Sequence, residues 1–214
     1  GHNAVCPSHP DTIILIEDII DEIAELFPSR FLHAGLDEAV LEGCPRCEER
    51  GRGRPDWWVF AEHAKAVHGM ITQRGKRMVI WADAVEKHPG LLEALPKDIL
   101  LAHWHYREVP FDSITPSVDA GFEVVCVPAM SGDMGMPNAA NLTNVSDMTD
   151  AARALPDDRC RGMVVCWWES FRILRDTHPL AVAYAGAAME NRKALEPERF
   201  SCSFLAEYFG VDDP

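Results

Sequence analysis

The chain has 214 residues, of which 47% are hydrophobic and 25% are charged. That balance is typical of a globular domain and excludes a disordered chain, a collagen and a small disulfide-stapled scaffold. The formal net charge of −14 disfavours nucleic acid as a partner, and no apolar run reaches the roughly 18 residues that a membrane span needs.

Helical and strand-like patterns alternate along the chain. Apolar residues recur at helical spacing at 11–27, 58–74 and 179–193, with shorter helical pieces at 90–95, 112–119 and 146–155. Strand-like runs are expected at 30–35, 77–81, 99–104, 122–127 and 162–168. These runs are nearly continuously hydrophobic, as strands are when a parallel sheet is buried on both faces. The alternation predicts an α/β fold with a parallel sheet.

The number of strands decides between two architectures. A closed eight-stranded α/β barrel typically needs about 250 residues, whereas this chain offers five strand–helix units after an initial helix. It is therefore either an open five-stranded sheet or the C-terminal five-eighths of a barrel. In the initial helix, the stripe Ile13, Ile16, Ile20 and Ile23 is expected in the core.

Polar and aromatic residues gather where the predicted strands end, and in an α/β barrel those ends build the active site. They are His33, Asp37, Glu38, Trp81, Asp83, Trp104, Tyr106, Trp167 and Glu169. Adjacent carboxylates repel, so one of them can hold a proton near neutral pH, and such a pair suits the cleavage of a glycosidic bond. Tryptophan faces pack against sugar rings. The pattern favours a carbohydrate ligand over a phosphate ligand.

The segment 31–38, FLHAGLDE, resembles the His-x-Gly-Gly-Asp-Glu signature of glycoside hydrolase family 20, the β-N-acetylhexosaminidases. Segments 75–81 and 162–169 are similar to later strands of that family, and the resemblance covers about residues 5–190. It implies a (β/α)8 TIM barrel in which the acid pair lies at the C-terminal end of the fourth strand. Residues 1–214 would then be a single partial barrel domain, truncated to strands 4–8 with their helices.

The resemblance also implies a substrate-assisted retaining mechanism, with no cofactor, on a glycan or amino-sugar substrate. Glu38 would be the general acid and base, and Asp37 would orient the 2-acetamido group. Trp81, Trp104 and Trp167 would wall the sugar pocket, and Glu169 would accept hydrogen bonds from sugar hydroxyls. His33, Asp83 and Tyr106 complete the predicted substrate-binding set, whereas Trp57 and Trp58 are expected to pack.

Two departures from the family pattern keep other functions open. Leu36 replaces the second glycine of the signature, and the loop at 128–134 lacks the tyrosine that the family places there. A carbohydrate-binding relative with impaired catalysis is the alternative, and an unrelated open α/β protein is a third interpretation. A truncated barrel exposes unpaired strand edges, so self-association through them is expected.

The seven cysteines are an odd count and look reduced. Cys44 and Cys47 form a lone C-x-x-C, and a structural zinc would need two further ligands, for which Cys6, His2, His9 and His63 are available. A plain loop or a redox-labile thiol pair is the alternative, and we predict no metal site. His63, His68 and His88 are expected on helix surfaces or in loops.

Overall fold

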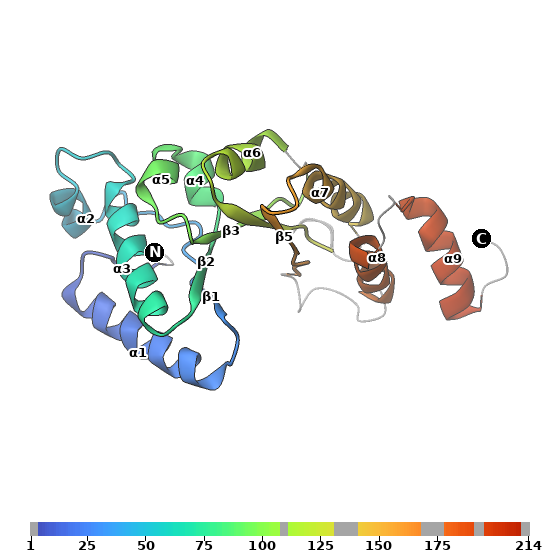
Figure 1. Ribbon diagram of the computed structural model, residues 1–214, viewed down its shortest axis with the longest axis horizontal. Helices are drawn as coiled ribbons and strands as arrows, with labels where there is room; N and C mark the ends of the chain where they lie inside the picture. Colours follow the sequence, from blue (N-terminus) through green and yellow to red (C-terminus); the bar gives the residue numbers. More distant parts are fainter. Residues whose placement is uncertain (1–3, 108–110, 131–140, 168–177, 191–194, 211–214) are drawn as a thin grey trace. The chain divides into compact units, whose positions relative to one another are not determined.

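The structure is a computed structural model that describes residues 4–107, 111–130, 141–167, 178–190 and 195–210 (Figure 1). Within these ranges the strands are β1 (Phe31–His33), β2 (Arg77–Trp81), β3 (Leu100–Trp104), β4 (Glu123–Val127) and β5 (Cys160–Met163). The helices are α1 (Pro10–Leu26), α2 (Pro45–Arg50), α3 (Trp58–Gln73), α4 (Asp83–Lys87), α5 (Gly90–Ala94), α6 (Phe111–Asp119), α7 (Leu142–Ala154), α8 (His178–Glu190) and α9 (Pro197–Phe209).

The chain forms two compact units. The first comprises residues 1–102 and 116–123, and the second comprises residues 103–115 and 124–214. Strands β3 and β4 and helix α6 contribute residues to both units. All the strand pairs described below are parallel and helices alternate with the strands, so the predicted α/β fold is confirmed.

The first unit is built on three parallel strands. Strand β1 pairs with β2 so that Leu32 lies opposite Met78, and β2 pairs with β3 so that Ile80 lies opposite Leu101. Helix α3 packs against β2. The core between them is aliphatic and fully buried: Ala61, Ala64, Val67, Ile71, Met78, Ile80 and Leu101. Gly75 ends the turn after α3 in the left-handed conformation (φ +70°), which glycine adopts without a steric penalty.

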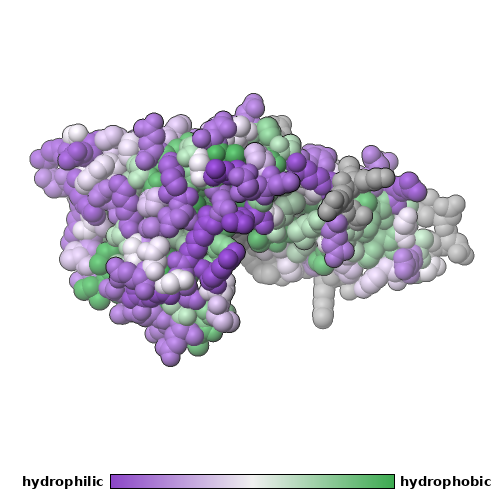
Figure 2. Space-filling view, viewed as in Figure 1, coloured by the Kyte–Doolittle hydropathy of each residue, from purple (hydrophilic) through white to green (hydrophobic). Residues whose placement is uncertain are grey.

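Helix α1 packs against α3, and Arg74 connects the two helices through ion pairs with Glu17 and Asp21. The predicted core stripe of α1 is only partly correct. Ile20 is buried and Ile13 and Ile16 are half-buried, but Ile23 is exposed. Further apolar residues of this segment also reach the surface: Ile14, Leu15, Ile19, Leu26 and Phe27. Figure 2 shows apolar surface over α1 among hydrophilic residues.

The second unit has its own core. Strand β4 pairs with β5 in parallel, and α7 packs against both β5 and α8, which in turn contacts α9. Tyr184 of α8 is fully buried at the centre of this cluster. Its hydroxyl donates to the Leu195 carbonyl oxygen (2.8 Å), and its ring meets Phe200 of α9 edge-on. A buried tyrosine normally finds such a partner for its hydroxyl.

The structure corrects several predicted boundaries. The last strand is Cys160–Met163 rather than 162–168, although Cys166 still forms an isolated bridge to Ala129. Helices α2, α4 and α9 were not predicted. Residues 168–177, which include Glu169, lie outside the described ranges. Among the described helices, none combines the length and the apolar character that crossing a bilayer requires.

Candidate active site

The acid pair lies on a loop of unusual backbone conformation directly after β1. Ala34 N–H donates to the Val79 carbonyl (2.8 Å) and Trp81 N–H donates to the Gly35 carbonyl (3.1 Å), so pairing with β2 continues past the end of β1. Gly35, Leu36 and Glu38 then adopt positive φ angles of 73°, 68° and 49°. Non-glycine residues in this region cost energy and mark sites that the surrounding structure holds in place.

Asp83 holds the backbone of Glu38. It is the first residue of α4, directly beyond β2, and it is 8% exposed. Its Oδ2 accepts a hydrogen bond from the Glu38 N–H (3.0 Å) and another from Lys87 Nζ (3.3 Å), while Oδ1 is buried and has no partner among the residues that the structure describes. A hydrogen bond to an ionised acceptor is stronger than a neutral one. The position of Glu38 therefore depends on a residue that follows the neighbouring strand.

His33 and Trp81 form one wall beside the acids. Their ring centroids lie 4.3 Å apart at 51°, and the His33 Nδ1 accepts the Gly35 N–H (3.0 Å). Nδ1 is thus the unprotonated nitrogen in this arrangement. Desolvation lowers the pKa of His33, and the negative charge of Asp37 partly opposes that shift. Both carboxylates, Asp37 and Glu38, stay exposed to solvent.

A cavity of about 590 Å³ adjoins this loop within the first unit. Residues 39–42, which follow Glu38, line it together with Cys47, Trp57, Phe60 and Asp83. Trp57, which the sequence predicts to pack, also lines this cavity. The local sequence around residues 57 and 58 could not show that Trp57 lines a cavity, because the residues that line it come from four separate segments of the chain.

The remaining predicted site residues belong to the second unit and are described there alone. The rings of Trp104 and Tyr106 lie 5.0 Å apart at 38°, and Asn141 Nδ2 donates to the Tyr106 carbonyl (2.8 Å). Trp167 is 36% exposed, and its ring meets that of His178 at a tilt of 51° with centroids 4.0 Å apart. Both tryptophans are partly exposed to solvent, as contact with a sugar requires. Glu169 falls outside the described residues.

Three cysteines of the first unit form a group that could hold a metal ion. Cys6, Cys44 and Cys47 place their Sγ atoms within 4.8 Å of one another. The Cys47 N–H donates to the Cys44 thiol and is the main cause that lowers the pKa of Cys44. Burial raises the pKa of Cys47 to about 11. Of the histidines named above as further ligands, His9 and His63 do not join this group, and His2 lies outside the described residues.

Solved structures resemble this arrangement. A β-N-acetylhexosaminidase from Bacteroides fragilis superposes with a TM-score of 0.75 at 18% identity, over 97% of this chain and 45% of its own. A family 20 exo-β-N-acetylglucosaminidase from Vibrio harveyi, solved with N-acetylglucosamine, gives 0.71 at 18% identity over 98% and 36%. At such identity the likeness establishes the fold.

Sequence comparison gives the family. A β-hexosaminidase of Vibrio furnissii is 27% identical over 132 residues, which are 59% of this chain and 20% of that protein. One from Porphyromonas gingivalis is 28% identical over 87 residues, 38% of this chain and 11% of its own length. The chain thus spans a small part of these relatives. The family model described as the catalytic domain of glycosyl hydrolase family 20 matches residues 1–158, so the chain belongs to glycoside hydrolase family 20.

Proposed function

We propose that this protein removes terminal β-linked N-acetylhexosamine from glycans by a substrate-assisted retaining mechanism. The observation that carries the proposal is the pair Asp37–Glu38 on a left-handed loop at the carboxyl end of a parallel strand. The backbone of Glu38 is fixed there by the buried Asp83, and the His33–Trp81 wall stands beside it. Catalytic residues of α/β barrels come from such strand ends.

The chemistry divides between the two carboxyl groups. Asp37, as the carboxylate, accepts the N–H of the substrate's 2-acetamido group and stabilises the positive charge that develops on its nitrogen. The acetamido oxygen attacks the anomeric carbon while the bond to the leaving oxygen breaks. Glu38, protonated, gives its proton to that oxygen. Glu38 then takes a proton from the water that opens the cyclic intermediate, so the configuration is retained.

Leu36 bears directly on the choice between an enzyme and a binding-only relative. The family signature has glycine at this position, and a side chain there raises doubt about the loop. In the structure Leu36 has φ 68°, the conformation that glycine adopts readily. The loop therefore keeps a glycine-like course with leucine in place, and this supports the enzyme over the carbohydrate-binding alternative.

The other residues proposed to contact substrate lie in both units, with Trp81 in the first and Trp104, Tyr106 and Trp167 in the second. Trp81, Trp104 and Trp167 pack against the sugar and the acetamido methyl group, Tyr106 and Glu169 bind polar groups of the sugar, and His33 and Asp83 support the acids. The partly exposed faces of Trp104 and Trp167 support this assignment.

The five strands correspond, on this proposal, to strands 4–8 of a (β/α)8 barrel within one domain. The exposed apolar side of α1 supports it, since Ile14, Ile19 and Leu26 would be covered by a preceding strand–helix unit. Without that unit the chain would self-associate. Reading the gene upstream of the Gly1 codon tests the assignment: three further strand–helix units would support it, and an in-frame stop there would contradict it.

The decisive experiment is Glu38→Gln in the full-length protein, assayed on N-acetyl-β-glucosaminides. We expect kcat/KM to fall roughly 10²–10⁴-fold, because glutamine cannot donate a proton. The loss must be larger for an alkyl leaving group than for an acidic phenol, which leaves with little help. Glu25→Gln, an exposed glutamate of α1, is the matched control. Unchanged rates in Glu38→Gln refute the proposal, and tight sugar binding without turnover in the unaltered protein favours the binding-only relative.

A further inference from the structure

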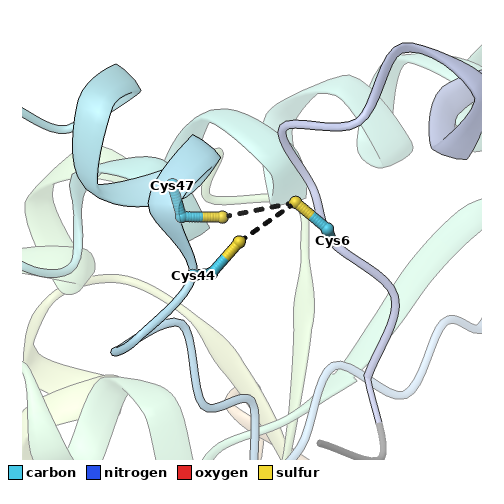
Figure 3. A group of neighbouring side chains, drawn as sticks. All are labelled: Cys6, Cys44 and Cys47. Atoms are coloured by element: carbon cyan, nitrogen blue, oxygen red, sulfur yellow. Dashed lines mark hydrogen bonds between the residues drawn. The ribbon is translucent and has the colours of Figure 1, made fainter.

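Three thiols from two distant segments converge beside the acid loop. Cys6 lies in the segment before α1, Cys44 caps the N-terminus of α2, and Cys47 lies in the first turn of that helix (Figure 3). The Cys6 Sγ lies 3.4 Å from the Cys44 Sγ and 3.7 Å from the Cys47 Sγ. All are free thiols, and Cys47 is 3% exposed.

These separations match a tetrahedral thiolate site. Zinc binds cysteine sulfur at about 2.3 Å, which places two sulfurs of one tetrahedron about 3.8 Å apart. A disulfide instead requires sulfurs about 2.05 Å apart. The observed 3.4 and 3.7 Å lie close to the first value and far from the second. The spacing C-x-x-C at the start of a helix turns both of its sulfurs toward one side, where Cys6 meets them.

The surroundings hold the sulfurs in this arrangement. Ser8 Oγ donates to the Cys47 Sγ (3.4 Å), and Thr12 Oγ1 donates to the Cys6 carbonyl (2.8 Å). Arg50, at the end of α2, donates to the Pro7 carbonyl (3.0 Å) and so ties the segment that bears Cys6 to the helix that bears Cys47.

We infer that Cys6, Cys44 and Cys47 bind one zinc ion as thiolates and leave one position for a fourth ligand. Thiolate ligands select zinc over magnesium or calcium. Among the described residues no further histidine, cysteine or carboxylate joins the three, and the candidate ligand His2 lies outside the described residues. The site revises the sequence-based expectation of no metal, because that expectation had no means of placing Cys6 next to the C-x-x-C pair.

Such a site would clamp the acid loop from its far end. The chain between Cys6 and Cys44 contains α1, β1 and the loop that bears Asp37 and Glu38. Asp83 fixes the loop at Glu38, and zinc would fix it again at Cys44, six residues later. The inference does not depend on the proposed glycosidase activity, and its readouts are metal content and spectra.

The test uses the full-length protein, purified under reducing conditions, with Zn²⁺ or Co²⁺ added and the excess removed. We expect about one zinc per chain by elemental analysis, and a Co²⁺ form with an intense near-ultraviolet thiolate-to-metal band. Cys6→Ser and Cys44→Ser should each lose bound zinc and weaken that band. Cys202→Ser, at the exposed cysteine of α9, is the control and should retain both.

Two results would overturn the inference. One is reduced protein that binds no zinc and gives no thiolate-to-cobalt band. The other is a disulfide between any two of the three cysteines in a parallel preparation isolated without reductant, seen as a 2 Da mass difference that thiol reductants reverse. The cobalt spectrum of the unaltered protein needs no variant, so it decides the matter even if a cysteine variant folds poorly.

Discussion

Leu36 provides a direct test of the strain in the acid loop. Its φ of 68° lies in the left-handed region, which costs an L-residue about 1–2 kcal/mol. Glycine does not carry that cost, but its unfolded chain is more flexible. Ordering glycine on folding therefore costs about 0.4–1 kcal/mol more than ordering alanine. The Leu36→Gly variant should therefore be more stable than Leu36→Ala by about 1 kcal/mol. At an ordinary position the order of the two variants is the reverse.

The comparison of these two variants isolates the backbone, since both lose the half-buried leucine side chain. That loss costs about 1 kcal/mol, so Leu36→Gly should lie near the unaltered protein and Leu36→Ala about 1 kcal/mol below it. Urea unfolding of the full-length protein measures both. Ala34→Gly, two residues earlier and at an ordinary φ, is the control and should destabilise by about 0.5–1 kcal/mol. A Leu36→Ala variant as stable as Leu36→Gly would refute the reasoning.

Two further predictions concern stability. A Cβ added at Gly90 would lie 2.7 Å from the Trp57 ring, so Gly90→Ala should destabilise the protein by about 1–3 kcal/mol. The control Gly69→Ala, in open space on α3, should stabilise it by about 0.5–1 kcal/mol. Equal urea midpoints of the two variants would contradict this. Burial, and then the charge of Arg50, lower the pKa of His63, so below about pH 6.5 the unfolded chain binds a proton that the folded chain does not. As the pH is lowered below about 6.5, the unfolding free energy should therefore decrease, by up to about 1.4 kcal/mol per pH unit, and it should decrease less in His63→Gln. Parallel pH profiles of the two proteins would count against this cause.

The fold was largely predictable because its signals are local. The apolar run at 77–81 is strand β2 residue for residue, and the helix expected at 58–74 is α3 with one residue less. The last strand was misplaced because residues 162–168 contain a strong apolar run, whereas the pairing with β4 begins at Cys160. Periodicity cannot show which part of an apolar run meets a neighbouring strand.

The prediction of the buried stripe on α1 failed in part for a related reason. Helical spacing shows which residues share a face, but the depth of burial depends on what covers that face. Ile20 meets a neighbour and is buried, whereas Ile23, one turn later on the same stripe, is exposed. His63 is the opposite case. It was expected on a helix surface, and the structure buries it with its Nδ1 lacking a partner among the described residues.

The site was predictable in its residue types and less so in its geometry. Asp83 entered the predicted site because it follows a strand end, and its role toward substrate stays a prediction. The structure adds its hydrogen bond to the Glu38 N–H, which depends on the register of β1 against β2. Register arises from long-range pairing and leaves no trace in either segment alone. The same holds for Cys6, 38 residues from Cys44 in sequence.

The hydrogen bond between Asp83 and Glu38 limits how this protein can be recombined with its relatives. Strand–helix units of an α/β repeat fold are natural modules for chimeras, with crossovers in the turns between them. A crossover between β1 and β2 would pair the acid loop of one parent with the carboxylate support of the other. Residues 31–87, from the start of β1 to the end of α4, therefore form the smallest segment that can be transplanted with its acid correctly supported.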